Sequence, residues 1–160
     1  VANAVIAQLL YLESEDGGQE FTFHCRGAGE GVSAGLAIYD TMSYVRCPVS
    51  TICLGQAASM GAFLLAAGTK GMRRALPHSR VMIHQPLGGM QGQVTEMEIY
   101  YELIKEQQKA LYDILAEHTG QPYETIERDC DRDNWMKAKE AKDYGLVDEV
   151  LDRSSAKKEE

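Results

Sequence analysis

Ser59 could act as a nucleophile, and it lies among small residues in the segment 55–62 (GQAASMGA). The β-branched residues 49–54 predict a buried strand, residues 55–58 a turn, and residues 59–67 an apolar helix. A serine at a helix N-terminus can attack a carbonyl carbon while the next N–H, that of Met60, binds the developing oxyanion. The same position also suits a serine that only caps the helix.

A serine nucleophile needs a base, and His84 stands at the end of a predicted strand, residues 81–84, followed by a loop. His24 lies in another predicted strand and stays a competitor. His78 and His118 lie in a polar turn and at a helix end, where we expect surface side chains. For each histidine, a purely structural hydrogen bond is the alternative.

A carboxylate that orients the imidazole is the third requirement of such a site. Spacing does not choose between Asp129, Asp131 and Asp133, and a solvated charge cluster is the alternative. Together the three segments predict an acyl-transfer site. The absence of a Gly-x-Ser-x-Gly motif argues against an α/β-hydrolase, and the glycines in residues 27–31 lack the spacing of a dinucleotide-binding loop.

Composition argues against several other classes of protein. The 160 residues suffice for one domain, with a formal net charge of -8 and 44% hydrophobic residues. Nucleic-acid binding is not indicated, because phosphates require a basic surface. No apolar run is long enough to span a bilayer, and no signal or transit peptide is recognisable. The four cysteines form no Cys-x-x-Cys pair, so we predict reduced thiols and no metal site.

Strands that alternate with helices predict an α/β fold with an at least partly parallel sheet. We expect Ser33 to cap one helix, and Thr95 with Glu98 to form a capping box at the start of the longest helix, which Gly120 ends. The predicted helices cover residues 1–12, 33–46, 59–67, 95–118, 123–130 and 138–144. The predicted strands cover residues 21–25, 49–54, 72–76, 81–84 and 147–151. We expect loops at residues 13–20 and 26–31. Residues 85–93 should form an extended segment, and residues 154–160 a disordered tail.

Six segments of the chain resemble the ClpP family, and the serine and histidine segments together are highly specific to it. These are residues 8–10 (QLL), 39–42 (YDTM), 55–61 (GQAASMG), 82–86 (MIHQP), 118–121 (HTGQ) and 144–148 (YGLVD). The resemblance implies a crotonase-like α/β fold of repeated β-β-α units, with a protruding handle made of a strand and a long helix at about residues 85–118. It implies one domain over residues 1–151, with the family's axial loop and first helix upstream of Val1. Residues 152–160 are expected to be a charged, disordered tail.

The resemblance also implies a function, that of a self-compartmentalising serine endopeptidase. Heptameric rings, homomeric or mixed, would stack as a tetradecamer, and an AAA+ Clp unfoldase would deliver unfolded polypeptides to them. No cofactor is expected, because ATP is used by the unfoldase, and neither a nucleic acid nor a membrane is expected as a partner. The bacterial cytoplasm or the chloroplast stroma is the expected location, and cleavage after apolar residues is the expected preference.

Carried over by motif, Ser59 is the nucleophile, His84 the base and Asp133 the orienting acid. The N–H of Met60 is one donor to the oxyanion. Asp131 and Arg132 match the pair that, in this family, links contact between rings to alignment of the triad.

One loop departs from the family pattern, which normally reads Asn-Ser-Pro-Gly-Gly where this chain has residues 26–30 (RGAGE). Glu30 replaces the glycine whose N–H binds the oxyanion, although Gly29 beside it offers another N–H. We therefore expect a slow peptidase. One alternative is a weak or inactive ClpR-like structural subunit of a mixed ring. Another is a crotonase-type acyl-CoA enzyme, and the complete Ser/His/Asp set argues against this second alternative.

Overall fold

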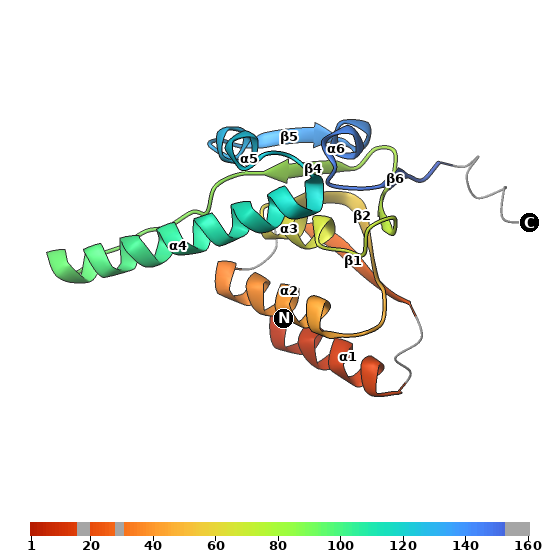
Figure 1. Cartoon of the computed structure of the whole chain (residues 1–160), viewed down its shortest axis with the longest axis horizontal. Helices are drawn as coiled ribbons and strands as arrows, with labels where there is room; N and C mark the ends of the chain where they lie inside the picture. The colour runs from red at the N-terminus through yellow and green to blue at the C-terminus, as the bar shows by residue number, and fades with distance from the viewer. Residues whose placement is uncertain (16–19, 28–30, 153–160) are drawn as a thin grey trace, which may run out of the picture.

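The structure is a computed structural model that describes residues 1–15, 20–27 and 31–152. Its strands form one six-stranded sheet around β2 (Figure 1). The strands are β1 (Phe21–Gly27), β2 (Val49–Ala58), β3 (Arg73–Ala75), β4 (Arg80–Ile83), β5 (Asn134–Lys137) and β6 (Glu149–Val150). One edge of β2 pairs with β1, while the other edge pairs first with β3 and then with β4, all in parallel. Only β5 runs antiparallel to its partner, β4, among the described pairs.

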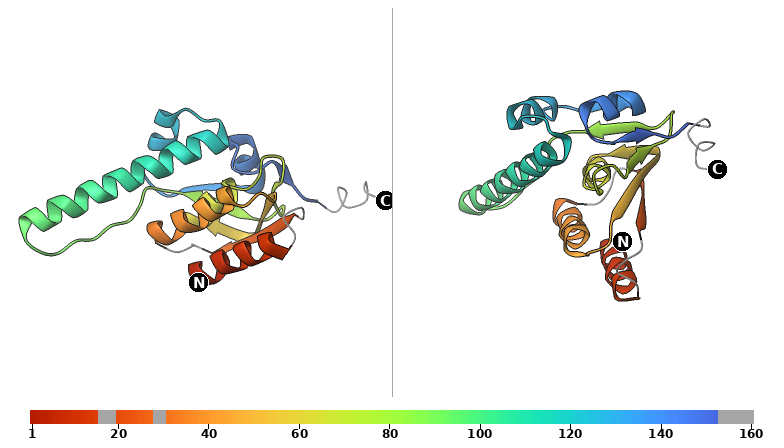
Figure 2. Two further views of the ribbon diagram at one scale, coloured as in Figure 1. Left: turned by 60° about the horizontal axis from the view of Figure 1, so that its bottom comes forward. Right: turned by 45° about the vertical axis from the view of Figure 1, so that its right-hand side comes forward.

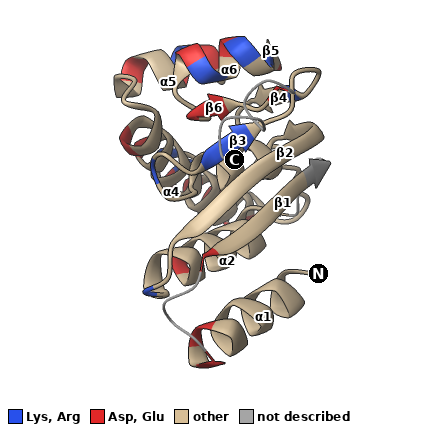
Figure 3. Cartoon of the chain, turned by 90° about the vertical axis from the view of Figure 1, so that its right-hand side faces the viewer, with Lys and Arg blue, Asp and Glu red and all other residues tan. Residues whose placement is uncertain are grey.

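Strand β2 is central because its sequence suits burial on both faces. It contains no Lys, Arg, Asp or Glu, so Figure 3 shows it in a single colour. It is longer than predicted, since residues 55–58 continue the strand instead of forming a turn. Pairing explains the difference, because Gln56, Ala57 and Ala58 lie opposite three residues of β4. Gly55 supplies the positive φ of 81° that the chain needs there.

Six helices of the described chain surround this sheet: α1 (Ala2–Glu15), α2 (Val32–Tyr44), α3 (Met60–Ala66), α4 (Val94–Thr119), α5 (Tyr123–Asp129) and α6 (Ala138–Tyr144). All seven residues of α3 are buried, so this helix lies at the centre of the core. Helices α1 and α2 lie side by side, and the 26-residue α4 passes α3 and projects beyond the sheet (Figure 2). Only the C-terminal half of α4 contributes buried residues, namely Leu111, Tyr112 and Leu115.

A buried ion pair joins the core to the last strand. Arg73 is 3% exposed, and its guanidinium donates to both carboxylate oxygens of Asp148 at 2.6 and 2.9 Å. The same guanidinium donates to the carbonyls of Ala66 and His118 at 3.1 and 2.9 Å. The pair therefore connects β3, the ends of α3 and α4, and the segment before β6.

Two helix starts differ from the prediction. Helix α2 begins at Val32 after Gly31, so Ser33 lies within the helix, and its hydroxyl accepts a hydrogen bond from Gln107 at 3.3 Å. Helix α4 begins one residue early, where the N–H of Gln93 donates to the Glu96 carboxylate at 3.2 Å. The carboxylate that closes the first turn is therefore not that of Glu98, because the chain enters α4 from an extended segment that places Gln93 at the cap.

Strand β5 was not predicted, since its four residues are too few to show alternation. Strand β1 continues to Gly27, two residues beyond its predicted end at residue 25. Residues 28–30 of the predicted loop lie outside the described part. Residues 85–93 form neither helix nor strand, so the strand that the resemblance implied for the handle is not formed there. Helix α1 extends to Glu15, and β6 is only two residues long.

All four cysteines are buried as free thiols, at residues 25, 47, 53 and 130. Burial raises the pKa of Cys53, and it raises that of Cys130 to about 12. A thiol with a raised pKa stays protonated near neutral pH and is a poor nucleophile. The cysteines are therefore not competitors of Ser59.

Candidate active site

Ser59 occupies the one residue between the end of β2 and the start of α3. Its backbone has φ 55° and ψ -121°, and it is the only non-glycine residue with positive φ in the described part of the chain. Such a conformation costs on the order of 1–3 kcal/mol, so the surroundings must enforce it. The Ser59 N–H donates to the Met82 carbonyl of β4 at 2.9 Å, and its own carbonyl accepts the Phe63 N–H at 3.1 Å.

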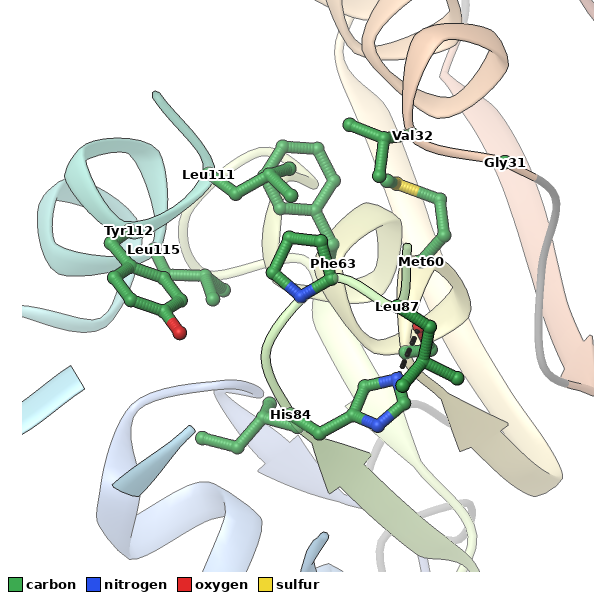
Figure 4. Close-up of a pocket in the computed structure, with 12 residues that line it drawn as sticks. Gly31, Val32, Met60, Phe63, His84, Leu87, Leu111, Tyr112 and Leu115 are labelled. Carbon is green, nitrogen blue, oxygen red and sulfur yellow. Dashed lines mark hydrogen bonds between the residues drawn. The ribbon is translucent and has the colours of Figure 1, made fainter. Parts of the chain in front are cut away.

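The Ser59 hydroxyl does not cap α3, although the residue stands at the N-cap position. It lies instead 2.9 Å from Nε2 of His84, the bond drawn as a dashed line in Figure 4. A serine that served only as a cap would bond to the N–H groups of the first helical turn. The geometry therefore favours the nucleophile over the capping alternative.

His84 follows directly after β4 and connects the serine to a carboxylate. Its Nδ1 lies 3.0 Å from Oδ1 of Asp133, and its side chain is 12% exposed. An Nδ1–H that donates to the carboxylate leaves Nε2 free to accept the proton of the Ser59 hydroxyl. The three side chains thus form one hydrogen-bonded chain.

Asp133 is selected from the three candidate aspartates by the antiparallel pairing of β4 and β5. Asn134 lies opposite Ile83 in that ladder, so the residue before Asn134 stands beside the residue after Ile83. Asp129 instead binds Arg128 at 2.9 Å and accepts the Tyr144 hydroxyl at 3.1 Å.

The other histidines lie away from the serine. His24 on β1 and His78 in a turn are both exposed. His118 is half-buried, contrary to the prediction of a surface position, and its Nε2 lies 3.3 Å from the Tyr39 hydroxyl. The reason is that the last turn of α4 packs against α2 and α3. Burial lowers the pKa of His118, so its imidazole is neutral near pH 7.

The N–H of Met60, which the sequence predicted as an oxyanion donor, lies at the start of α3, directly after Ser59. Met60 is the first residue of α3, and the N–H groups of a first helical turn have no partner within the helix. The Met60 side chain packs against α2 at Gly35, where an added Cβ would overlap it. Gly29 and Glu30, the other expected oxyanion residues, lie outside the described residues.

An apolar pocket of about 180 Å³ adjoins Ser59 and His84. Figure 4 shows its walls, which come from α2, α3, α4 and the segment after β4. The remaining lining residues are Gly31, Val32, Met60, Phe63, Ile83, Pro86, Leu87, Leu111, Tyr112 and Leu115. A pocket with these walls suits an apolar side chain of a ligand bound at the serine.

A model of the Clp protease family matches residues 1–154. The chain belongs to the Clp protease family. Clp proteases are serine peptidases that form ring assemblies and work with Clp unfoldases. The mixed α/β fold with its curled sheet is the ClpP-type fold that the sequence predicted.

Within this Clp protease, Asp131 and Arg132 lie at the corner that precedes Asp133. The guanidinium of Arg132 donates to the Asp131 carbonyl at 2.9 Å and stands 3.7 Å from the Asp131 carboxylate. Both side chains are exposed, at 67% for Asp131 and 82% for Arg132, so a neighbouring subunit can reach them. Their part in ring contact stays a prediction.

Two further features concern the described residues only. No group of three or more His, Cys, Asp or Glu side chains among them is arranged to hold a metal ion. None of their helices combines the length and the apolar character required to cross a membrane.

Proposed function

We propose that this chain is an active serine endopeptidase subunit of a Clp ring, with Ser59 as nucleophile, His84 as base and Asp133 as orienting acid. The observation that carries the proposal is the continuous chain of hydrogen bonds, at 2.9 Å between Ser59 and His84 and 3.0 Å between His84 and Asp133. The strained backbone of Ser59 supports it, since strain of this kind concentrates at functional sites.

In the proposed reaction, Nε2 of His84 takes the proton of Ser59 while Oγ attacks the carbonyl carbon of the scissile bond. The resulting oxyanion is stabilised by the N–H of Met60. His84 then returns the proton to the leaving amine, and the acyl-enzyme forms. A water molecule attacks the acyl-enzyme by the same route and restores the serine.

The proposed substrates are unfolded polypeptides, because the reaction requires an extended chain at the serine. Residues 85–93 form no ladder with the rest of the described chain, and the backbone of residues 86–92 between the bonded Gln85 and Gln93 is available to pair with a substrate strand. An AAA+ unfoldase would supply such chains to stacked heptameric rings, homomeric or mixed. Rings confine the site, which protects folded proteins from an unspecific peptidase.

We expect cleavage after apolar residues, because the 180 Å³ pocket beside Ser59 has apolar walls. Burial of a leucine side chain contributes about 1.5–3 kcal/mol, so kcat/KM for leucine before the scissile bond should exceed that for aspartate by about 10- to 100-fold. A peptide library varied at that position measures the preference, and the same library varied three residues away is the control. A preference for charged residues at the first position would contradict the expectation.

We also expect this chain to turn over slowly, because Glu30 replaces a glycine. Loss of one oxyanion donor typically costs on the order of 10²- to 10³-fold in rate, and a nearby carboxylate opposes the developing charge. Glu30→Gly, tested alone and together with Ala28→Pro, should raise kcat at least severalfold while Ser59 remains the residue labelled by a fluorophosphonate. An unchanged kcat in both variants would show that Gly29 or a neighbour already supplies the donor.

The second candidate function is that of a ClpR-like structural subunit, and Glu30 in place of the family's glycine favours it. The discriminating experiment is fluorophosphonate labelling of the wild-type chain, followed by mapping of the labelled residue. Labelling at Ser59 together with peptide cleavage supports the peptidase. A chain that enters rings but is neither labelled nor active would overturn it.

A further inference from the structure

The carboxylate of Asp133 is aligned with His84 although it is poorly enclosed. The Asp133 side chain is 63% exposed, so packing does not hold it in place. Its position therefore depends on the backbone that carries it. On the C-terminal side this backbone is fixed by the β4–β5 ladder, in which Ile83 pairs with Asn134 and Met82 with Trp135.

The N-terminal side is fixed by Gln85, the residue directly after His84. The Gln85 N–H donates to the Cys130 carbonyl at 2.6 Å, and its Nε2 donates to the Asp131 carbonyl at 2.7 Å. Cys130 is 0% exposed, so the backbone at this point is anchored in the core. Two bonds from one residue thus join the end of β4 to the segment that leads into Asp133.

The other end of the Gln85 amide is bound to α4. Its Oε1 accepts a hydrogen bond from Nε2 of Gln108 at 3.4 Å, and the same Nε2 donates to the Tyr112 hydroxyl at 3.2 Å. Because both ends of the amide have partners, its orientation is defined. Tyr112 lines the apolar pocket, so this connection reaches from the pocket wall to the backbone of Asp131.

We propose that Gln85 is a positioning residue of the peptidase, an inference that rests on the proposed function. Through the Asp131 carbonyl it holds the backbone that carries Asp133, and through Gln108 it links this alignment to α4. Gln85 is outside the set of residues that line the pocket, and among the described residues its side-chain amide bonds to Gln108 and Asp131 alone. It therefore acts on the reaction through Asp133.

A misplaced carboxylate has two kinetic consequences. A displacement of about 1 Å at a reacting constellation costs on the order of 10²-fold in rate, chiefly in kcat. In addition, the carboxylate stabilises the imidazolium that forms when His84 takes the proton of Ser59, so a weaker contact slows the attack of Ser59 on a fluorophosphonate as well. A general loss of folded protein lowers the final extent of labelling and leaves the labelling rate of the folded molecules unchanged.

The test compares Gln85→Met, which keeps the side-chain length and removes both amide bonds, with the full wild-type chain. We expect kcat for peptide cleavage to fall about 10- to 100-fold with KM little changed. Fluorophosphonate should label Ser59 more slowly than in the wild type, but to the same final extent. Gln108→Met, which spares the bond to Asp131, should show the same changes to a smaller extent.

Gln121→Met is the matched control, since it also removes a glutamine bond to a carbonyl, here from Nε2 to Tyr144 at 3.0 Å. It should keep the wild-type kcat and labelling rate. If Gln85→Met does not fold, Gln85→Asn takes its place, because its amide is one methylene too short to reach both partners. A folded Gln85 variant whose kcat and labelling rate match those of Gln121→Met would overturn the inference.

The labelling arm separates this inference from the proposed function. A wild-type chain that is labelled at Ser59 but cleaves no peptide overturns the peptidase alone, and the labelling rates of the variants still decide the role of Gln85. A wild-type chain that is not labelled overturns both, since no competent triad would then exist to be positioned.

Discussion

Ser59→Ala should abolish peptide cleavage and fluorophosphonate labelling while rings still assemble. The variant removes only the hydroxyl that lies 2.9 Å from Nε2 of His84 and leaves the apolar pocket intact. Removal of the serine of a Ser-His-Asp triad typically lowers kcat by about 10⁴-fold or more. Alanine is nearly as small as serine, so the backbone at φ 55° meets no new clash. The measurements are kcat with a fluorogenic peptide, labelling detected by mass spectrometry, and native mass.

Ser33→Ala is the matched control for this variant. Ser33 is an exposed serine in α2 whose hydroxyl accepts a bond from Gln107 at 3.3 Å and does not line the pocket at Ser59. Its kcat should stay within about twofold of the wild type, because surface substitutions usually change little. Cleavage by the Ser59→Ala chain at the wild-type rate would contradict the assignment of the nucleophile.

Asp148→Ala should lower the free energy of unfolding by about 3–5 kcal/mol, because it leaves the buried guanidinium of Arg73 without its counter-charge. Arg73 is 3% exposed, and it donates to both oxygens of Asp148. The variant also removes the acceptor of the Gly71 N–H at 2.7 Å. Chemical denaturation followed by circular dichroism, at one fixed protomer concentration, measures the loss.

The stabilisation by Asp148 should disappear in acid. Burial alone raises the pKa of this carboxyl, but hydrogen bonds from Arg73 and Gly71 hold the pKa below its ordinary value of 3.8. The folded state therefore binds a proton less readily than the unfolded state. The contribution is complete well above pH 4 and is lost as the pH falls through the folded-state pKa. The difference between wild type and variant should accordingly shrink below about pH 4.

The exposed pair of Lys109 and Asp113, at 2.6 Å on α4, offers the control. Asp113→Ala removes the same chemical group from a solvent-exposed ion pair, which typically contributes little to stability. It should leave the denaturation midpoint nearly unchanged. If Asp148→Ala destabilises the chain no more than Asp113→Ala does, the buried ion pair of Arg73 and Asp148 does not stabilise the fold as expected.

Local patterns in the sequence were sufficient to predict most of the elements. Helix α6 has the predicted bounds of residues 138–144, and α4 ends at the predicted Gly120, whose φ is 76°. Caps, breakers and the period of apolar residues act over a few neighbouring residues, so the sequence shows them directly. The motifs around Ser59 and His84 were equally local, and they led to the family that the comparison with the Clp protease model shows.

Spacing in the sequence left three aspartates open and the family resemblance pointed to Asp133, but only the tertiary structure gave the physical reason. His84 and Asp133 are 49 positions apart, and they meet because β5, a strand too short to be recognised beforehand, pairs antiparallel with β4. Three other features also became visible only in the tertiary structure. These are the continuation of β2 through residues 55–58, the burial of His118, and the contact of Arg73 with Asp148 over 75 positions. The bonds from Gln85 to residues 130 and 131 likewise could not be predicted from the sequence. The physical reason is that a local pattern determines how one segment folds, whereas the partner of a strand edge or a buried charge depends on all segments packed around it.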